Sequence, residues 1–188
     1  MEQSQATTRF YAEVWPHAPT VLRTARFLLR NSADADDVAQ ETMLKAFRSL
    51  ERLKPGTDAK AWLLTILRNT RIDHLRSRAS DRNVSLEQLA DDPEARGQPG
   101  RFDDDEAWDD PESLLQAFGD QQIIDAMRQL PEEIRWTLLL VDVHGMDIAE
   151  AASVLDVPLG TIKSRSHRGR AMLRDVLLPL ARGLRYVR

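Results

Sequence analysis

The sequence predicts an all-α protein in which two small helical domains are joined by an acidic flexible linker, the C-terminal domain containing a helix-turn-helix. Apolar residues recur every three or four positions in both halves of the chain, which is the period of amphipathic helices, and no alternating strand pattern of useful length occurs. Residues 91–113 instead carry many acids, three prolines and no helical stripe. We therefore expect an N-terminal domain over 1–82, a linker over 83–113 and a C-terminal domain over 114–188.

The composition excludes several classes of protein. The chain has no cysteine, so disulfides, thiolate metal sites and a cysteine nucleophile are excluded. The N-terminus lacks the apolar core of a signal peptide, and no apolar run approaches the roughly 20 residues that cross a bilayer. We expect a cytoplasmic protein without stable membrane insertion. The formal net charge of −4 argues against general affinity for nucleic acid, so the distribution of charge matters more than its sum.

Successive amphipathic helices are predicted in the N-terminal domain. The first apolar stripe indicates a helix that ends near Asn31. Ser32 or Asp34 can cap the next helix, because a short polar side chain satisfies the free N–H groups of the first turn. The predicted buried stripe of this second helix comprises Val38, Met43 or Leu44, Phe47 and Leu50.

A third long helix follows a break at Pro55 and Gly56. Thr57 or Asp58 can cap it. Its predicted apolar side comprises Trp62, Leu63, Ile66, Leu67, Thr70 and Leu75.

The C-terminal domain is predicted to begin at Leu114 with another helix. The apolar stripe of that helix comprises Ile123, Ile124, Met127 and Leu130. Pro131 suits the first turn of the following helix, and Gly145 suits the position just after its end.

A helix-turn-helix is predicted after Gly145. The first of its two helices, in MDIAEAASVLD, has an inner face that comprises Ile148, Ala149, Ala152 and Leu155. Asp156 can take the left-handed conformation that the turn needs, and Pro158 suits the start of the second helix. The inner face of the second helix is predicted to comprise Leu159, Ile162, Met172 or Leu173, and Val176 or Leu177.

The second helix concentrates positive charge. Lysine and arginine occupy five of the twelve positions 163–174, and no acid interrupts them before Asp175. The outer face of this helix comprises Thr161, Lys163, Ser164, Arg165, His167 and Arg168. Such a helix fits the major groove of B-DNA, which is about 12 Å wide. The alternative is a solvated basic helix in an ordinary bundle.

Three segments resemble one known family. The stretch DIAEAASVLDVPLGTIKSRSHRGRAMLRDVL is similar to the fourth conserved region of extracytoplasmic-function (ECF) sigma factors, which carries an IAE…LG-VP-GTVKSR-hydrophobic-HRAR string. The stretch DADDVAQETMLKAF resembles the family's DAED-VQE-F-RAW segment, and AWLLTILRNTRIDHLRSR resembles its AWL-IARN-IDHLR segment. Matches in the family's order on both sides of a linker are far more specific than a helix-turn-helix alone.

The resemblance implies a sigma factor that binds core RNA polymerase and directs promoter-specific transcription initiation. It implies core RNA polymerase, promoter DNA and an anti-sigma factor as partners, no cofactor or metal, and no enzymatic activity. The residues matched to binding of the −35 element are Thr161, Lys163, Ser164, Arg165, His167, Arg168 and Arg170. Those matched to the −10 element are Trp62, Arg68, Asn69, Arg71 and Arg76, and those matched to polymerase binding are Asp37, Gln40, Glu41 and Leu44.

The chain departs from the family pattern at a few positions. Asp156 stands where the turn glycine is usual, which affects the turn angle, and Leu67 stands where a small residue is usual. Ser166 replaces a customary apolar residue, and we expect looser packing there. None of these departures removes a polar or basic contact group.

Other functions remain open at this point. A sigma-like decoy would bind an anti-sigma factor without binding DNA, and a dimeric repressor would use the helix-turn-helix on a palindrome. An enzyme would need Asp36, Asp37, Glu41 and the histidines at 17, 74, 144 and 167 as a metal or acid–base site, but these histidines are dispersed and lack metal-ligand spacing.

Overall fold

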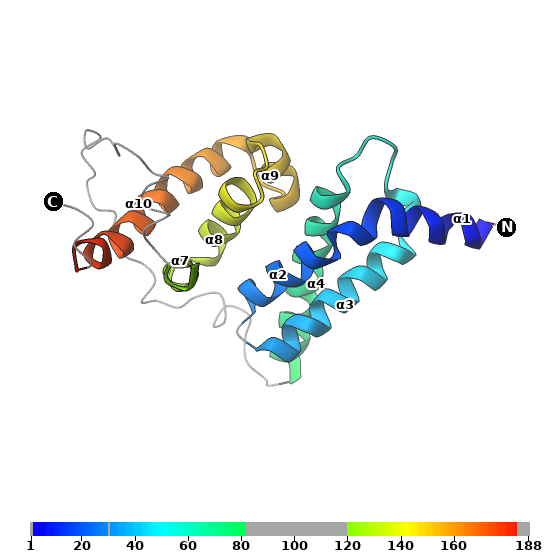
Figure 1. Cartoon of the computed structure of the whole chain (residues 1–188), viewed down its shortest axis with the longest axis horizontal. Coiled ribbons are helices and arrows are strands. Elements are labelled where there is room, and N and C mark those ends of the chain that lie inside the picture. The colour runs from blue at the N-terminus through cyan, green and yellow to red at the C-terminus, as the bar shows by residue number, and fades with distance from the viewer. Residues whose placement is uncertain (1, 30, 82–119, 184–188) are drawn as a thin grey trace. The chain divides into compact units, whose positions relative to one another are not determined.

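The computed structural model describes residues 2–29, 31–81 and 120–183, and within them all regular structure is helical (Figure 1). The prediction of an all-α protein is confirmed. The predicted linker lies outside the described residues for its whole length. No helix within the described part of the chain is long and apolar enough to cross a bilayer.

The chain divides into two compact units. Of the described residues, the first unit contains 2–29, 31–81 and 149–156, and the second contains 120–148 and 157–183. The domain boundaries expected from the sequence stay a prediction.

The first unit is built on three long helices, α2, α3 and α4, that pack against one another (Figure 1). Its elements in the N-terminal part of the chain are α1 (Glu2–Arg9), η1 (Phe10–Val14), η2 (Trp15–His17), α2 (Ala18–Leu28), α3 (Ser32–Arg48), η3 (Leu50–Arg52) and α4 (Ala59–Asp81). The largest fully buried side chains include Val21 of α2, Val38 of α3, and Leu63 and Leu67 of α4. The core therefore lies between these three helices.

The helix starts of the first unit correct one prediction and confirm another. Asn31 caps α3, because its extended backbone lets the side-chain oxygen accept from the Ala33 amide at 2.9 Å, so the prediction of Ser32 or Asp34 is wrong. Asp34 instead forms an ion pair with Arg78 of α4. Asp58 caps α4 as predicted, its Oδ1 accepting from the amide of Lys60 at 2.7 Å.

The buried face of α3 differs from the predicted stripe. That face consists mainly of small residues, namely Ala35, Val38, Ala39, Thr42 and Ala46. Because small side chains let α2 and α4 approach closely, the larger Leu44 and Phe47 remain outside, 43% and 42% exposed. The prediction that Phe47 is buried is therefore wrong, whereas Val38 and Leu50 are buried as predicted.

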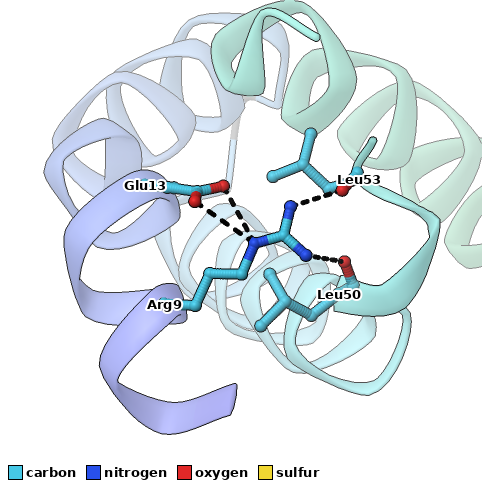
Figure 2. Close-up of polar contacts among 4 residues, drawn as sticks. All are labelled: Arg9, Glu13, Leu50 and Leu53. Carbon is cyan, nitrogen blue, oxygen red and sulfur yellow. Dashed lines mark hydrogen bonds and ion pairs between the residues drawn. The ribbon is translucent and has the colours of Figure 1, made fainter. Parts of the chain in front are cut away.

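Arg9 ties the N-terminal helical segment to the end of η3 (Figure 2). Its guanidinium donates to the backbone carbonyl of Leu50 at 3.5 Å and to that of Leu53, while its Nε forms an ion pair with Glu13 at 3.1 Å. The Leu50 carbonyl also accepts from the Leu53 amide at 3.1 Å, so Arg9 adds a second donor there, and it supplies a side-chain donor to the Leu53 carbonyl just after η3. Arg9 therefore acts as a side-chain cap from a distant part of the sequence.

The C-terminal part of the chain contains α7 (Asp120–Arg128), α8 (Glu132–Leu138), η5 (Leu139–Val143), α9 (Ile148–Leu155) and α10 (Leu159–Gly183). Within the second unit, α10 packs against α8 and α7. Arg135 of α8 caps the end of α7 much as Arg9 caps η3, with its Nη2 donating to the carbonyls of Arg128 at 2.6 Å and Leu130 at 2.7 Å. Gly145 has the positive φ of +67° expected of a residue after a helix end.

Small residues bring α10 close to α8. A Cβ atom added to Gly169 would lie 2.6 Å from Cγ2 of Ile134 and 3.0 Å from the Leu138 side chain. Gly169 takes the place of the alanine in the family's HRAR string. Ser166, one turn earlier on α10, is buried, and its hydroxyl has no hydrogen-bond partner in the structure.

The two helices predicted for the helix-turn-helix form as α9 and α10, and two burial predictions in them are wrong. Asp156 has a φ of +53°, so it supplies the left-handed residue of the turn as predicted. Leu159 is exposed because it is the first residue of α10, and Ala149 is also exposed, so neither faces inward as predicted. The buried residues of α9 are Ala151, Ala152, Val154 and Leu155.

Candidate polymerase and promoter surfaces

The residues matched to polymerase binding share one face of α3. Asp37, Gln40, Glu41 and Leu44 are spaced at i, i+3, i+4 and i+7, which places them on one side of a helix. Asp37 and Gln40 are exposed, and Glu41 is half-buried beside Lys45, with 3.9 Å between its Oε1 and the lysine Nζ. The opposite side of α3 faces the core, so this row is available to a partner.

Exposed aromatic side chains extend this row, and the sequence interpretation missed them. Phe47 lies one turn after Leu44, and its ring packs edge-on against that of Phe10 with 5.2 Å between centroids. Tyr11 and Trp15, 57% and 51% exposed, pack against each other and against Phe10. The signal for them in the sequence is that Tyr11 and Trp15, in the stretch FYAEVW, are four residues apart and therefore share one face of a helix. Clustered exposed apolar side chains of this kind indicate an interaction surface.

Some of the residues matched to the −10 element share a face of α4. Trp62, Asn69 and Arg76 are spaced by seven residues, about two turns, and therefore lie on the same side. Asn69 and Arg76 are exposed, while Trp62 is half-buried. Arg68, at the edge of this face, is also half-buried.

The structure does not bring Arg71 to the same face. Its position is about 200° around the helix from Asn69, at 100° per residue, and its side chain is only 6% exposed. Arg71 therefore lies on the inner side of α4.

Asp73 lies in the middle of the α4 face, between Asn69 and Arg76. It carries negative charge where the resemblance expects contact with DNA. Lys45 of α3 forms an ion pair with it at 3.1 Å between Nζ and Oδ2. The sequence interpretation missed this pair because the partners are far apart in the chain.

The residues matched to the −35 element all lie on α10. Lys163, Ser164, His167 and Arg168 are exposed, whereas Thr161 and Arg165 are half-buried. The Ser164 hydroxyl donates to the Thr161 carbonyl at 3.0 Å and keeps its acceptor lone pairs free. Over residues 2–29, 31–81 and 120–183, no acidic side chain forms an ion pair with Lys163 or Arg168. Their positive charge is therefore available to a polyanion.

Arg170 differs from the other cations of this set because a carboxylate holds it. Its Nη2 donates to Oδ1 of Asp142 at 2.6 Å, and its Nε donates to Oδ2 at 3.3 Å. The hydrogen bond to Asp142 raises the pKa of Arg170 above its ordinary value, and burial opposes the rise.

Two of the carboxylates considered for an enzyme, Asp36 and Glu41, lie beside basic side chains. Asp36 forms an ion pair with Arg26 at 3.0 Å, and this pairing raises the pKa of Arg26. Within the described residues, no group of three histidine, aspartate or glutamate side chains could hold a metal ion.

Comparison with known proteins identifies both halves of the chain. Residues 14–80 match the Sigma-70 region 2 family, and residues 120–173 match the Sigma-70 region 4 family. The chain is 36% identical over 165 residues to the ECF RNA polymerase sigma factor SigE of Mycolicibacterium smegmatis, an alignment that covers 86% of this chain but only 58% of that protein. It is 30% identical over 156 residues to the ECF RNA polymerase sigma-E factor of Haemophilus influenzae, covering 82% of this chain and 79% of that protein.

A solved structure agrees with these matches. The sigma factor RpoE from Bartonella quintana, determined in complex with the anti-sigma factor NepR, superposes with a TM-score of 0.67 and 26% sequence identity. The superposition covers 89% of this chain and 96% of that chain. The chain therefore belongs to the ECF family of RNA polymerase sigma factors, which are transcription initiation factors rather than enzymes.

Proposed function

We propose that this protein binds core RNA polymerase and directs it to promoters, with α10 at the −35 element and α4 at the −10 element. The observation that most directly supports this proposal is the exposed cationic face of α10 in a chain whose formal net charge is −4. Charge concentrated on one helix favours a single polyanion site, and acidity elsewhere opposes indiscriminate binding. The protein acts in the cytoplasm and performs no chemistry of its own, because polymerase adds the nucleotides.

On α10, the exposed polar and cationic side chains are the candidates for base contacts. Lys163 and Arg168 have long side chains without an acidic partner in the described part of the chain, and Ser164 and His167 lie between them. Arginine and lysine pair with guanine edges, whereas serine contacts bases or phosphates. Arg165, which is half-buried, and Arg170, which is held by Asp142, are assigned to phosphates.

On α4, Asn69 is the candidate for reading an unstacked base of the −10 element. Its amide is exposed and can donate to and accept from a base edge. Arg68 and Arg76 flank it and are assigned to the DNA backbone. The burial of Arg71 supports a role inside the unit, so we leave it out of the phosphate contacts.

The row on α3 is the candidate surface for polymerase. Acidic and amide groups beside exposed Leu44 suit a helical partner with basic outer positions and an apolar seam. Phe47, Tyr11 and Trp15 enlarge the apolar part of this surface. Because the similar RpoE of Bartonella quintana was solved with an anti-sigma factor, we also propose that an anti-sigma factor binds this protein.

Transcription in vitro with core RNA polymerase and a promoter library tests the proposal. The expected result is a set of transcripts that require this protein and share a −35 and a −10 sequence. Changing Lys163 and Arg168 to glutamine should abolish the dependence on the −35 sequence while leaving core binding intact.

Two other results would contradict the proposal. Binding to core polymerase without any promoter-specific transcript would support a decoy for an anti-sigma factor. A palindromic footprint formed without core polymerase would support a repressor.

A further inference from the structure

We propose that Asp142 is a positioning residue for promoter binding, which fixes the Arg170 guanidinium on the flank of α10 so that it can contact a DNA phosphate. The inference rests on the proposed function of α10, and it assigns a role to an acidic residue beside a DNA-binding helix. Asp142 belongs to η5, outside the segment that resembles the family's DNA-contact string.

The contact has the geometry of a two-point clamp. Arg170 uses its Nη2 and Nε, at 2.6 and 3.3 Å from the two carboxylate oxygens, so the plane of the guanidinium is fixed. Arginine has five N–H donors in all, and three remain for another acceptor. The side chains of Arg170 and Asp142 are 60% and 36% exposed, so those donors remain accessible at the surface.

Packing between α8 and α10 places Asp142 beside Arg170. Ile134, Leu138 and Asp142 are spaced by four residues along α8 and η5. The first two face Gly169 closely enough that a Cβ atom there would collide with them. Because Gly169 lets α10 lie this close, the next residue, Arg170, meets the next member of the row, Asp142.

The place of Arg170 on α10 favours a phosphate as its target. Its guanidinium is held toward Asp142 of η5, at the edge of α10 that packs on the α8 side, rather than at the centre of the outer face. Side chains on the flanks of a recognition helix reach the DNA backbone more readily than the base edges. A guanidinium that is already ordered loses less conformational freedom when the phosphate binds.

Whether Asp142→Asn strengthens or weakens promoter binding distinguishes this positioning role from charge repulsion alone. A carboxylate near DNA repels the phosphates, so removing the charge of Asp142 should strengthen binding if charge alone matters. If Asp142 positions Arg170, the same change should weaken binding. The two explanations predict opposite results for Asp142→Asn.

The test uses the full chain bound to core polymerase and measures equilibrium binding to a promoter fragment that the wild type recognises. We expect Asp142→Asn to weaken binding about fivefold, the lower end of the effect of removing one specific interaction with DNA, and Asp142→Glu to restore much of it. Asp175→Asn is the matched control, because it removes the same charge from α10 beside Arg174, 3.5 Å away, without touching Arg170. It should not weaken binding.

Combining Asp142→Asn with Arg170→Gln tests whether the effect of Asp142 on promoter affinity passes through Arg170, which a merely structural role would not require. In an Arg170→Gln background, Asp142→Asn should cause no further loss of affinity, because its effect passes through Arg170. Unchanged or tighter binding by Asp142→Asn, or a loss of affinity that adds to that of Arg170→Gln, would overturn the inference.

The same measurements distinguish a failure of the proposed −35 binding by α10 from a failure of the role proposed for Asp142. If Arg170→Gln and the change of Lys163 and Arg168 to glutamine all leave promoter binding unchanged, α10 does not bind the −35 element. If the Lys163 and Arg168 changes weaken binding but Asp142→Asn does not, only the role of Asp142 is wrong.

Discussion

At the scale of single residues, Gly169 sets how closely α10 approaches α8. Alanine favours a helix over glycine by about 1 kcal/mol, but the added methyl group would lie 2.6 Å from Cγ2 of Ile134. Since that contact requires a shift in a packed interface, we expect Gly169→Ala to lower the free energy of unfolding by about 1–3 kcal/mol. Urea denaturation followed by circular dichroism measures the change.

Gly160 in the same helix is the matched control. A Cβ atom at this position would meet nothing within 4 Å. Gly160→Ala should therefore be neutral or slightly stabilising. Equal effects of the two substitutions would show that the contact with Ile134 does not limit packing.

Arg9 is the residue that joins the N-terminal helical segment to the end of η3. Replacing it with glutamine removes donors from the carbonyls of Leu50 and Leu53. Hydrogen bonds from a charged donor contribute about 1.5–3 kcal/mol. Because the Arg9 side chain is 32% exposed and water competes for these donors, we expect the free energy of unfolding to fall by about 1–2 kcal/mol. Thermal unfolding measures the change.

Arg23 provides the comparison for Arg9. It is exposed, and its side chain forms a 3.3 Å hydrogen bond to Thr20 within the same helix. Arg23→Gln should change stability by less than about 0.5 kcal/mol. If both arginine changes had the same small effect, the cap at η3 would have no energetic role.

At the scale of elements, α10 combines an apolar side that packs on α8 with a cationic outer side. Replacing Lys163 and Arg168 by glutamine should weaken promoter binding and make it less sensitive to salt, because fewer counterions are released from the DNA. For each phosphate that the variant no longer neutralises, the slope of log affinity against log salt should fall by about 1. Binding of the polymerase complex over a range of salt concentrations measures that slope.

The control for α10 changes the same amount of charge elsewhere. Arg52 and Lys54 are exposed in the segment after α3, far from α10 in the sequence. Replacing both with glutamine should leave the salt slope close to the wild-type value. A similar decrease in slope for both pairs would mean that only the net charge matters.

At the scale of the whole molecule, the first unit presents an exposed apolar side chain, Leu44, within the polar row of α3 that is the candidate polymerase surface. Leu44 is 43% exposed within the row of Asp37, Gln40 and Glu41. We expect Leu44→Ala to weaken binding to core polymerase about tenfold, as for an apolar anchor at an interface. Because the side chain is already partly in water, the free energy of unfolding should change by less than about 1 kcal/mol.

An exposed leucine of the second unit serves as the control. Leu159 is also exposed, at the start of α10, and no polymerase role is proposed for it. Leu159→Ala should leave core affinity unchanged in a fluorescence titration with core polymerase, the same measurement that is used for Leu44→Ala. If Leu44→Ala also left it unchanged, the row on α3 would not be the polymerase surface.

The sequence by itself determined the helical class, the helices and the segments that resemble the family. These features are local: apolar spacing indicates a helix, Asp58 caps α4, and Asp156 and Gly145 take the left-handed conformations that their turns need. The matched positions on α3 and α10 were also readable, because residues at helical spacing share a face.

Only the tertiary structure decided which apolar and charged residues face inward and which pairs meet. Phe47 is exposed because α3 packs through small residues, and Arg71 is buried although it lies among candidate DNA contacts. The pairs of Asp142 with Arg170 and Lys45 with Asp73 join residues 28 positions apart. Helical periodicity describes one helix at a time, whereas these outcomes depend on how neighbouring helices pack.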